Sequence, residues 1–555
     1  MKTAQDSIDQ PLPGEPRADR PGRTDPVVFG VAAAVALGFV AWGVFGTDSL
    51  ASVSGTVLDW VIDRLGWAFV LVASGFVVFA LWLAVSRYGR VPLGRDDERP
   101  EFRTVSWVAM MFSAGMGIGL MFYGVTEPLS HFVNPPPGTA PARSDEALRT
   151  AMSTTLFHWT VHPWAIYAVV GLAIAYGSFR RGRSQLVSAA FAPLLGTRRA
   201  NGPAGRAIDA LAVFATLFGS AASLGLGALQ IGSGLRAAGA GGVGNAVLVG
   251  VIAVLTMAFV ASAVSGVARG IQWLSNTNMV LAVVLALFVF VVGPTVFVLN
   301  LVPAAIGGYF GDLADMAGRT AASGGDATAT WLSGWTIFYW AWWISWTPFV
   351  GMFIARISRG RTIRQFVAGV IGVPSLVSLV WFCVFGGTAV FLQREGVDVA
   401  GAATPEGRLF AVLEHYPLAA VAVVVVMVLV AIFFVSGADA ASVVMGTLSQ
   451  RGSIAPTKGV VVFWGVLTGA VAAVMLLVGG SNALTGLQNL TIIAALPFAV
   501  VMVGLCVSLA RDLRSDPLIR REERVAEVME EVTARLGPEE TALRTVERLV
   551  TPRGV

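Results

Sequence analysis

Twelve segments of this chain are apolar and long enough to cross a lipid bilayer as helices. Hydrophobic residues make up 55% of the 555 residues and charged residues only 13%, a balance that is typical of polytopic membrane proteins and leaves no large soluble domain. The sequence therefore predicts an all-α membrane protein with twelve transmembrane helices. The predicted spans are residues 27 to 46, 66 to 86, 104 to 125, 152 to 176, 207 to 234, 244 to 264, 271 to 300, 332 to 355, 365 to 393, 418 to 448, 459 to 479 and 487 to 510.

Basic residues indicate how these helices are oriented. The two tails and the even-numbered loops hold 31 of the 38 Lys and Arg, whereas the odd-numbered loops hold 7. Because basic loops stay on the cytoplasmic side, we expect a multi-pass protein of the inner (plasma) membrane with both termini in the cytoplasm. Residues 1 to 26 are predicted to be a disordered tail and residues 511 to 555 a helical one. The net charge of +4 follows from this asymmetry and indicates no nucleic-acid partner.

Aromatic side chains crowd one predicted span. Trp340, Trp342, Trp343 and Trp346 lie within seven residues of a charge-free stretch. A quaternary ammonium group has no N–H to donate, so proteins hold it against aromatic faces, whose quadrupole attracts the charge. An interfacial aromatic belt is the alternative, and it suits Trp335 at the start of the span. Because Trp343 and Trp346 lie at mid-membrane depth, the pattern favours a cavity for an organic cation.

Glycines interrupt another predicted span. Gly115, Gly117 and Gly119 occupy alternate positions of the third span, and each weakens a helix by about 1 kcal/mol relative to Ala. Close packing between helices is one explanation. The other is a broken helix, which often opens each of two inverted repeats in transporters, and Pro348 marks a matching place in the second half. The predicted division is two extra helices at 27 to 103, a first five-helix repeat at 104 to 300, an external amphipathic segment at 301 to 331 and a second five-helix repeat at 332 to 510.

Three stretches carry a family resemblance: GMGIGLMFYGVTEP at 115 to 128, FHWTVHPWAIY at 157 to 167, and the Trp-rich run at 335 to 360. Through them the chain closely resembles the betaine/carnitine/choline transporter family, and within it the sodium-coupled glycine betaine symporters. The resemblance implies a LeuT-type fold, in which two extra helices precede the inverted repeats, and assembly as a homotrimer. It implies a transporter in the lipid bilayer, with no enzymatic activity and no organic cofactor.

The resemblance also implies a substrate site with two parts. One part is a trimethylammonium cage, and the other is the glycine-rich break, where backbone N–H groups would bind a substrate carboxylate. Glycine betaine is the expected zwitterionic substrate, and choline, carnitine and ectoine are alternatives because the same cage tolerates several cations. Ring packing without any ligand is the alternative for the fourth-span residues. The implied residues are Trp159, Trp164, Tyr167 and Trp343 for the cage, Trp342 and Trp346 beside it, and Gly115, Met116, Gly117 and Gly119 at the break.

Hydroxyl residues suggest sodium as the coupling ion. Thr216 and Ser220 are four residues apart on the fifth span and therefore share a face. Hydrogen bonds from both hydroxyls to their own helix are the alternative. The resemblance implies two Na⁺ sites, the first formed by Thr216, Ser220 and Phe349 and the second by Ser113, Met116, Phe433 and Ser436.

Two glycines bear on the coupling mechanism. Relatives carry a hydroxyl residue at the position of Gly437, so the second sodium site lacks one ligand and a sodium-independent exchanger stays open as an alternative. Gly119 stands where proton-coupled choline transporters of the family carry an aspartate. This substitution argues against proton coupling.

Ionisable residues inside predicted spans are expensive and therefore candidates for function. We expect Asp439 to hydrogen-bond within the bundle near the ion site, and Glu127 to lie at a helix terminus or gate. His158 and His162 have the spacing of a metal pair, but no third ligand accompanies them in the sequence. We therefore expect both histidines to pack or hydrogen-bond at the outer mouth.

Overall fold

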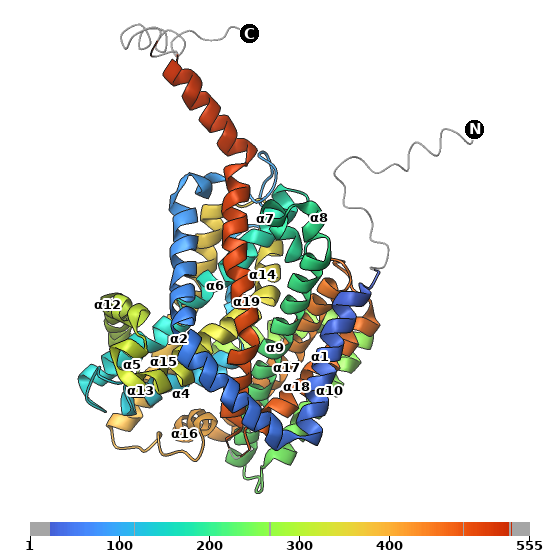
Figure 1. The fold of residues 1–555 in the computed structure, drawn as a ribbon. Coiled ribbons are helices and arrows are strands. Elements are labelled where there is room, and N and C mark those ends of the chain that lie inside the picture. Colours follow the sequence, from blue (N-terminus) through green and yellow to red (C-terminus); the bar gives the residue numbers. More distant parts are fainter. Residues whose placement is uncertain (1–22, 116, 266–267, 481, 532–533, 535–555) are drawn as a thin grey trace.

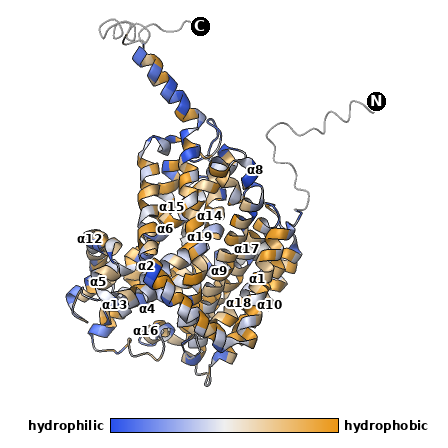
Figure 2. Ribbon diagram, in the orientation of Figure 1, coloured by the Kyte–Doolittle hydropathy of each residue, from blue (hydrophilic) through white to orange (hydrophobic). Residues whose placement is uncertain are grey.

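The computed structural model describes residues 23–115, 117–265, 268–480, 482–531 and 534. Within these ranges the regular elements are helices, with one isolated bridge between Pro92 and Thr362. The long helices form one bundle (Figure 1), and apolar residues cover its flank (Figure 2), as expected of a surface that faces lipid. The helices are α1 Pro26–Phe45, α2 Thr47–Val85, α3 Thr104–Gly115, α4 Ile118–Val133, α5 Asp145–Trp159, α6 Val161–Ala175, α7 Ala192–Leu195, α8 Thr197–Ala200, α9 Pro203–Ala237, α10 Asn245–Ser265, α11 Ala268–Val292, α12 Thr295–Gly318, α13 Gly325–Leu332, α14 Phe338–Ile357, α15 Ile363–Arg394, α16 Arg408–Leu413, α17 Ala419–Ser449, α18 Lys458–Val478 and α19 Ala483–Arg514.

Ten helical stretches of the described residues are long and apolar enough to span a membrane, with α5 and α6 counted together over Asp145–Arg180, against twelve spans predicted from the sequence. The third predicted span is divided between α3 and α4, and the seventh contributes only the shorter apolar stretch Asn276–Val292. The eighth lies in α14, whose Trp and Tyr residues make it less apolar than an aliphatic helix. α12, which was not among the predicted spans, is also long and apolar enough to cross a membrane. The exact number of spans and the division into two five-helix repeats stay predictions.

The break predicted at the glycine-rich motif is present. α3 ends at Gly115 and α4 begins at Ile118. Gly117 precedes α4 in an extended conformation, with φ −172° and ψ −177°. No side-chain cap binds the first turn of α4. Backbone N–H groups of that turn are consequently available to a ligand.

The matching interruption predicted around Pro348 is wrong, because α14 continues through this residue. A proline has no N–H to donate to the carbonyl four residues earlier, here that of Ile344. The hydroxyl of Thr347 donates to this carbonyl instead, at 2.6 Å. The helix therefore keeps its path across the proline.

The segment predicted as external and amphipathic starts earlier than expected. α11 ends at Val292, where Gly293 and Pro294 interrupt the helix, so the predicted seventh span is wrong at its end. α12 then occupies 24 residues and lies beside α5 (Figure 1). A salt bridge of 2.8 Å between Arg149 and Asp312 joins α5 to α12.

The helices α6, α9 and α14 form the centre of the bundle. All residues of α6 from His162 to Ala175 are buried, and α14 packs against both α6 and α9. Gly219 allows the close approach of α9, since a Cβ there would lie 2.7 Å from Cδ1 of Trp346. Because α6 is buried on all sides, it lies inside the bundle and does not face lipid.

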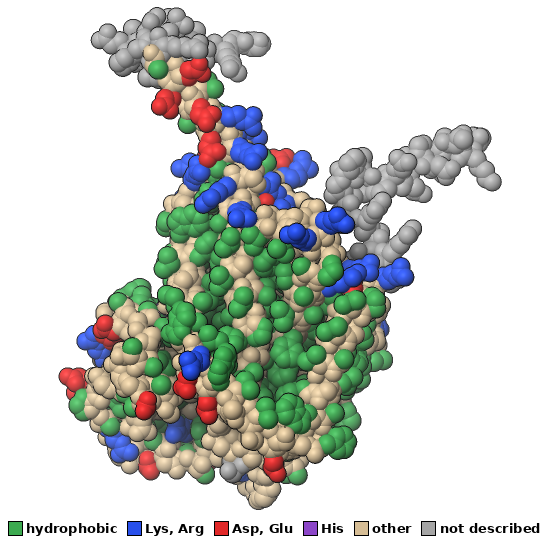
Figure 3. Space-filling model, in the orientation of Figure 1, with side chains coloured by type: hydrophobic (Ala, Val, Ile, Leu, Met, Phe, Trp, Pro, Cys, Tyr) green, Lys and Arg blue, Asp and Glu red, His purple; other side chains and the backbone are tan. Residues whose placement is uncertain are grey.

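Arginine and carboxylate pairs join several segments at one end of the bundle. Arg180, just after α6, donates to both carboxylate oxygens of Asp516, at 2.9 and 2.8 Å. Arg206 near the start of α9 donates to Asp25, the N-cap of α1, at 3.2 Å. Lys and Arg side chains gather at this end of the molecule (Figure 3). It is the end that the basic-residue distribution predicts to be cytoplasmic.

Candidate functional site

Aromatic rings of α5, α6 and α14 wall a cavity of about 50 Å³. The ring centroids of Trp159 and Trp343 are 5.0 Å apart with planes at 75°, and those of Tyr167 and Trp343 are 6.2 Å apart at 77°. Rings of different orientation therefore line the cavity, and Trp343 also stacks on Trp342 with centroids 4.7 Å apart. The aromatic residues of the lining, which we name the cage, are the six that the family resemblance implies: Trp159, Trp164, Tyr167, Trp342, Trp343 and Trp346.

The glycine-rich break contributes one side of this cavity. Gly117 and Gly119 both line it. A Cβ at position 119 would lie 2.7 Å from Cη2 of Trp342 and 2.8 Å from Cη2 of Trp159, so these two rings close over the glycine. Gly115 is the last residue of α3, and Met116 lies outside the described residues. The structure thus joins the break and the cage in one site.

A second helix break positions the cage residues of α5 and α6. Thr160 separates these helices with φ −115° and ψ −107°. Pro163 has no N–H to donate to the carbonyl of Trp159. The neighbouring carbonyl, that of His158, accepts a hydrogen bond from Nε1 of Trp343 at 3.0 Å. Backbone freed from regular helix geometry thereby orients a cage ring on α14.

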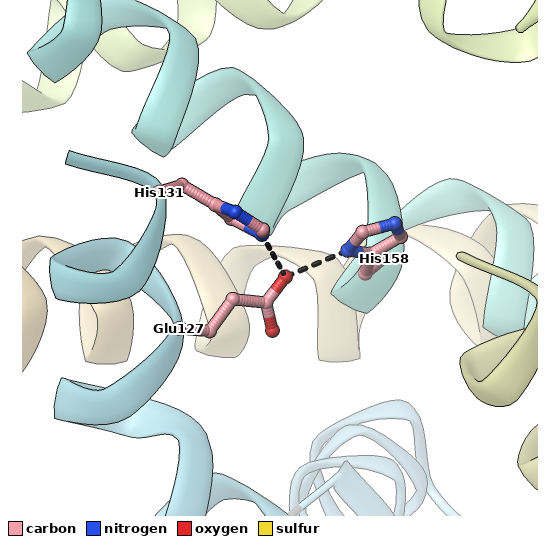
Figure 4. A group of neighbouring side chains, drawn as sticks. All are labelled: Glu127, His131 and His158. Carbon is pink, nitrogen blue, oxygen red and sulfur yellow. Dashed lines mark hydrogen bonds and ion pairs between the residues drawn. The ribbon is translucent and has the colours of Figure 1, made fainter. Parts of the chain in front are cut away.

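A fully buried polar cluster of Glu127, His131 and His158, drawn in Figure 4, adjoins the cage. Oε2 of Glu127 accepts hydrogen bonds from Nε1 of Trp159, at 2.7 Å, and from the hydroxyl of Tyr339. Oε1 of Glu127 lies 2.6 Å from Nδ1 of His158 and 3.5 Å from Nε2 of His131, and both rings point toward it. Glu127 lies inside α4 and is 0% exposed, so the prediction of a helix terminus is wrong, and its alternative, a gate residue, stays a prediction.

The cluster has three groups of the kind that bind metals, but a hydrogen bond explains its shortest contact better. Two ligand atoms on one tetrahedral Zn²⁺ lie roughly 3.3 Å apart, given metal–nitrogen lengths of about 2.0 Å. The 2.6 Å separation of Glu127 and His158 is shorter than that. The other histidine of the predicted pair, His162, stacks on Trp340 with centroids 5.1 Å apart, so the two histidines do not face one site.

Residues of both predicted sodium sites lie around a second cavity of about 210 Å³. It shares Gly117 and Trp346 with the cage cavity, so the two cavities are neighbours. The Thr216 hydroxyl is buried outside this lining and donates to the carbonyl of Ala212 at 2.8 Å, as in the alternative interpretation. Its oxygen lone pairs remain available to a cation. The predicted ion-site residues in the lining are Ser220, Phe349, Phe433 and Ser436.

The second predicted sodium site is described only in part. Met116 lies outside the described residues, and for Ser113 only the backbone, within α3, is described. Ser436 donates to the carbonyl of Ile432 at 2.8 Å. Gly437 faces open space, because a Cβ there would meet no atom within 4 Å. Asp439 follows on α17 and is half-buried.

Sequence reasoning missed the polar groups that hold the tryptophans. Ser223 accepts a hydrogen bond from Nε1 of Trp342 at 3.1 Å. The Glu127 carboxylate accepts from Trp159, and the carbonyl of His158 accepts from Trp343. Most buried indole N–H groups have an acceptor, although that of Trp346 has none among the described residues. This tendency could have prompted a search for acceptors, but the partners come from helices whose packing the sequence does not show.

Comparisons with known proteins show the family of the chain. The model of the BCCT family, described as the betaine/carnitine/choline family transporters, matches residues 27–518. The chain belongs to the BCCT family. The predicted family is thereby confirmed, and members of it are transporters and not enzymes.

Two BCCT relatives are similar over most of their length. The betaine/ectoine transporter LcoP of Corynebacterium glutamicum is 48% identical over 500 residues, which cover 90% of this chain and 79% of LcoP. The glycine betaine transporter OpuD of Bacillus subtilis is 45% identical over 506 residues, which cover 91% of this chain and 96% of OpuD. The chain is therefore a multi-pass membrane transporter of the BCCT family.

Among solved structures, a Na⁺-coupled sialic acid symporter in a substrate-bound outward-open state aligns with a TM-score of 0.40 and 12% identity, over 79% of this chain and 86% of that chain. We draw nothing about function from a likeness of this size.

Proposed function

We propose that the protein imports a trimethylammonium osmolyte, above all glycine betaine, by sodium symport with alternating access. The observation that carries this proposal is the cavity walled by six aromatic rings, with no Lys or Arg among its described lining residues. Ring faces attract a quaternary ammonium group, whereas a basic side chain there would repel it. The names of two similar BCCT transporters support the same substrate class.

The carboxylate of glycine betaine would bind at the break before α4. The first turn of α4 presents N–H groups without intrahelical partners, and the helix dipole places partial positive charge there. Gly117 and Gly119 have no side chain to block that approach and line the cage cavity. The cationic and anionic ends of the substrate would then contact different walls of one cavity.

Sodium would bind beside the substrate. Ser220, Phe349, Phe433 and Ser436 line the neighbouring cavity, which shares Gly117 with the substrate cavity. α14 lines both cavities, so an ion and a substrate would stabilise the same position of this helix, and such a shared preference couples two ligands. We place this transporter in the inner membrane with both termini cytoplasmic, and we propose a homotrimer, as the family resemblance implies.

Two observations favour alternatives to sodium-coupled betaine uptake. LcoP is named a betaine/ectoine transporter, so ectoine, whose positive charge is delocalised over the amidinium group of its ring, is a second candidate substrate. Gly437 supplies no side-chain oxygen to the second ion site, which favours a sodium-independent exchanger.

Uptake of labelled glycine betaine into proteoliposomes tests the proposal. Accumulation should require an inward sodium gradient and should be inhibited by unlabelled glycine betaine more strongly than by ectoine, choline or carnitine. Vesicles with potassium in place of sodium, and vesicles preloaded with substrate, are the controls. Uptake that needs internal substrate and ignores sodium would identify an exchanger, and uptake inhibited best by ectoine would change the substrate.

A further inference from the structure

Glu127 touches the cage without lining its cavity. Its carboxylate is 0% exposed, and Oε2 accepts the indole N–H of Trp159 at 2.7 Å. The ring of Trp159 lines the cage cavity and therefore links Glu127 to any bound cation. A buried carboxylate costs several kcal/mol unless its surroundings compensate it. Its position beside a binding cavity therefore needs an explanation.

Hydrogen-bond donors around Glu127 favour the charged carboxylate. The indole of Trp159 is a donor only, and the hydroxyl of Tyr339 donates to the same oxygen. Nδ1 of His158 lies 2.6 Å from the other oxygen, and Nε2 of the same ring lies 2.9 Å from the hydroxyl of Thr336. If the Thr336 hydroxyl donates to Nε2, the neutral ring donates its Nδ1–H to Glu127. Several donors directed at one carboxylate stabilise its anion.

Among the described residues, no Lys or Arg forms a salt bridge with the Glu127 carboxylate. The ionisable side chains that contact it are His131 and His158, and its other close contacts are the neutral donors Trp159 and Tyr339. Arg319 lies over the ring of Trp331 and is not paired with Glu127. A charge left uncompensated in a medium of low dielectric attracts a cation brought nearby. The cage is the place where a substrate cation would arrive.

We propose that Glu127 is the counter-charge and the positioning residue of the cage, and that it makes the cage prefer a cationic head group over an uncharged group of the same shape. This inference rests on the proposed function. A charge-assisted hydrogen bond from Trp159 fixes its ring and polarises it, which makes the ring face more negative. The carboxylate also attracts the substrate cation directly.

Substituting Glu127→Gln removes the charge with little change of shape. The amide oxygen can still accept from Trp159 and Tyr339, and the amide NH₂ can donate to Nδ1 of His158, provided that this ring donates its Nε2–H to Thr336. The Thr336 hydroxyl can donate to Nε2 in one tautomer of His158 and accept from Nε2–H in the other, so the hydrogen bond to Thr336 is kept in both. Glu127→Gln is consequently a test of charge and not of packing.

The experiment compares glycine betaine with 3,3-dimethylbutanoate, which replaces the ammonium nitrogen by carbon. Affinities of both compounds are measured by tryptophan fluorescence at saturating sodium, in the purified full-length parent, E127Q and E127D. We expect E127Q to bind glycine betaine roughly tenfold more weakly, within the range of cation–π and charge effects, and to bind 3,3-dimethylbutanoate within twofold of the parent. E127D keeps the charge and should keep most of the preference for glycine betaine, with weaker binding of both compounds.

Thr336→Val is the matched control for damage to the hydrogen-bond network. It removes the hydroxyl that bonds to Nε2 of His158 and leaves the Glu127 charge, so it should weaken the binding of both compounds by similar factors. The inference would be overturned if the ratio of the affinities for glycine betaine and 3,3-dimethylbutanoate were the same in E127Q as in the parent, whether both affinities stayed unchanged or both fell by the same factor. If E127Q does not fold, E127D decides, because loss of its preference for glycine betaine overturns the inference. A parent that binds no trimethylammonium compound overturns both this inference and the proposed function.

Discussion

The indole nitrogen of Trp343 on α14 donates a hydrogen bond to the carbonyl of His158 on α5, at 3.0 Å. This contact fixes the central ring of the cage against the helix that carries Trp159. Leu at position 343 keeps apolar packing but removes the aromatic face. We expect Trp343→Leu to weaken glycine betaine binding by roughly 2 kcal/mol, the magnitude of a desolvated cation–π contact. Calorimetry on purified protein measures the loss.

Trp60→Leu is the control for this substitution, because Trp60 is 57% exposed on α2, away from the cavity. It should leave the affinity unchanged. Equal affinities in the parent and Trp343→Leu would exclude Trp343 from the cation site.

Gly119 is the second test of the cage. Because an added Cβ would lie 2.7 Å from Cη2 of Trp342 and 2.8 Å from Cη2 of Trp159, Gly119→Ala must push these rings apart. We expect at least a tenfold loss of glycine betaine affinity, or about 1.4 kcal/mol, while the protein still assembles. Gly75→Ala on α2, where a Cβ meets nothing within 4 Å, is the control. Parent-like binding by Gly119→Ala would show that the rings need not close over this position.

Sodium coupling is tested at the paired hydroxyls of α9. Two hydroxyl oxygens reduce the cost of removing water from the ion, so Thr216→Ala combined with Ser220→Ala should raise the sodium concentration needed for half-maximal uptake several-fold. Binding of substrate at saturating sodium should change less. By reciprocity, substrate must lose the same coupling free energy in its effect on sodium affinity. Thr468→Ala, which removes a buried hydroxyl bonded to its own helix on α18, is the control.

The converse substitution lies at Gly437, where a Cβ would meet no atom within 4 Å. Gly437→Ser adds a hydroxyl to the wall of the cavity that Ser220 and Ser436 line. We expect it to lower the sodium concentration for half-maximal uptake. Uptake by the parent and both variants that is equally indifferent to sodium would favour the exchanger.

Part of this architecture could be predicted from the sequence. Alternate glycines at 115, 117 and 119 predicted a break that is present between α3 and α4. The aromatic residues that surround one cavity came from motifs shared with the BCCT family, together with the depth of Trp343 and Trp346. Local spacing suffices for the break, because it depends on one stretch of chain. The six cage residues come from three helices, and the family resemblance implied them as a set.

Other features depend on how distant helices pack. Pro348 was expected to interrupt α14, but the hydroxyl of Thr347 bonds the carbonyl that the proline leaves unpaired. Glu127 was expected at a helix end, yet its carboxylate lies at the junction of α4, α5 and α14. Its partner His158 is 31 positions away in the sequence, and its partner Tyr339 is 212 positions away. Hydrogen bonds over such separations cannot be deduced from the periodicity of one helix. The acceptors for the indole N–H groups were missed for this reason.

The predicted orientation can be tested by cysteine labelling. Arg143, in the loop between α4 and α5, and Arg198, in α8, are both exposed. If basic loops are cytoplasmic, Arg143→Cys should react with an impermeant maleimide in intact cells, and Arg198→Cys should react only after permeabilisation. The parent, with Cys383 and Cys506, gives the background. Labelling of both variants in intact cells would refute the orientation.

The last prediction concerns the paired hydrogen bonds from Arg180 to the carboxylate of Asp516, which we name the clamp, at the basic end of the bundle. Burial alone would raise the pKa of Asp516, but hydrogen bonds from Arg180 and Tyr176 outweigh it and hold the pKa below its ordinary value. A carboxyl whose pKa is lowered by folding stabilises the folded state above its unfolded pKa, about 3.9, and loses that contribution as pH falls through its folded pKa.

Asp516→Asn should therefore lower the apparent unfolding temperature in detergent at pH 7, at a fixed scan rate. The difference from the parent should shrink as pH falls below about 4, because protonation then weakens the parent's own clamp. Asp97→Asn, at a side chain that is 80% exposed, should change little at either pH. A difference that stays constant from pH 7 to acid would mean that the Asp516 charge does not stabilise this end of the bundle.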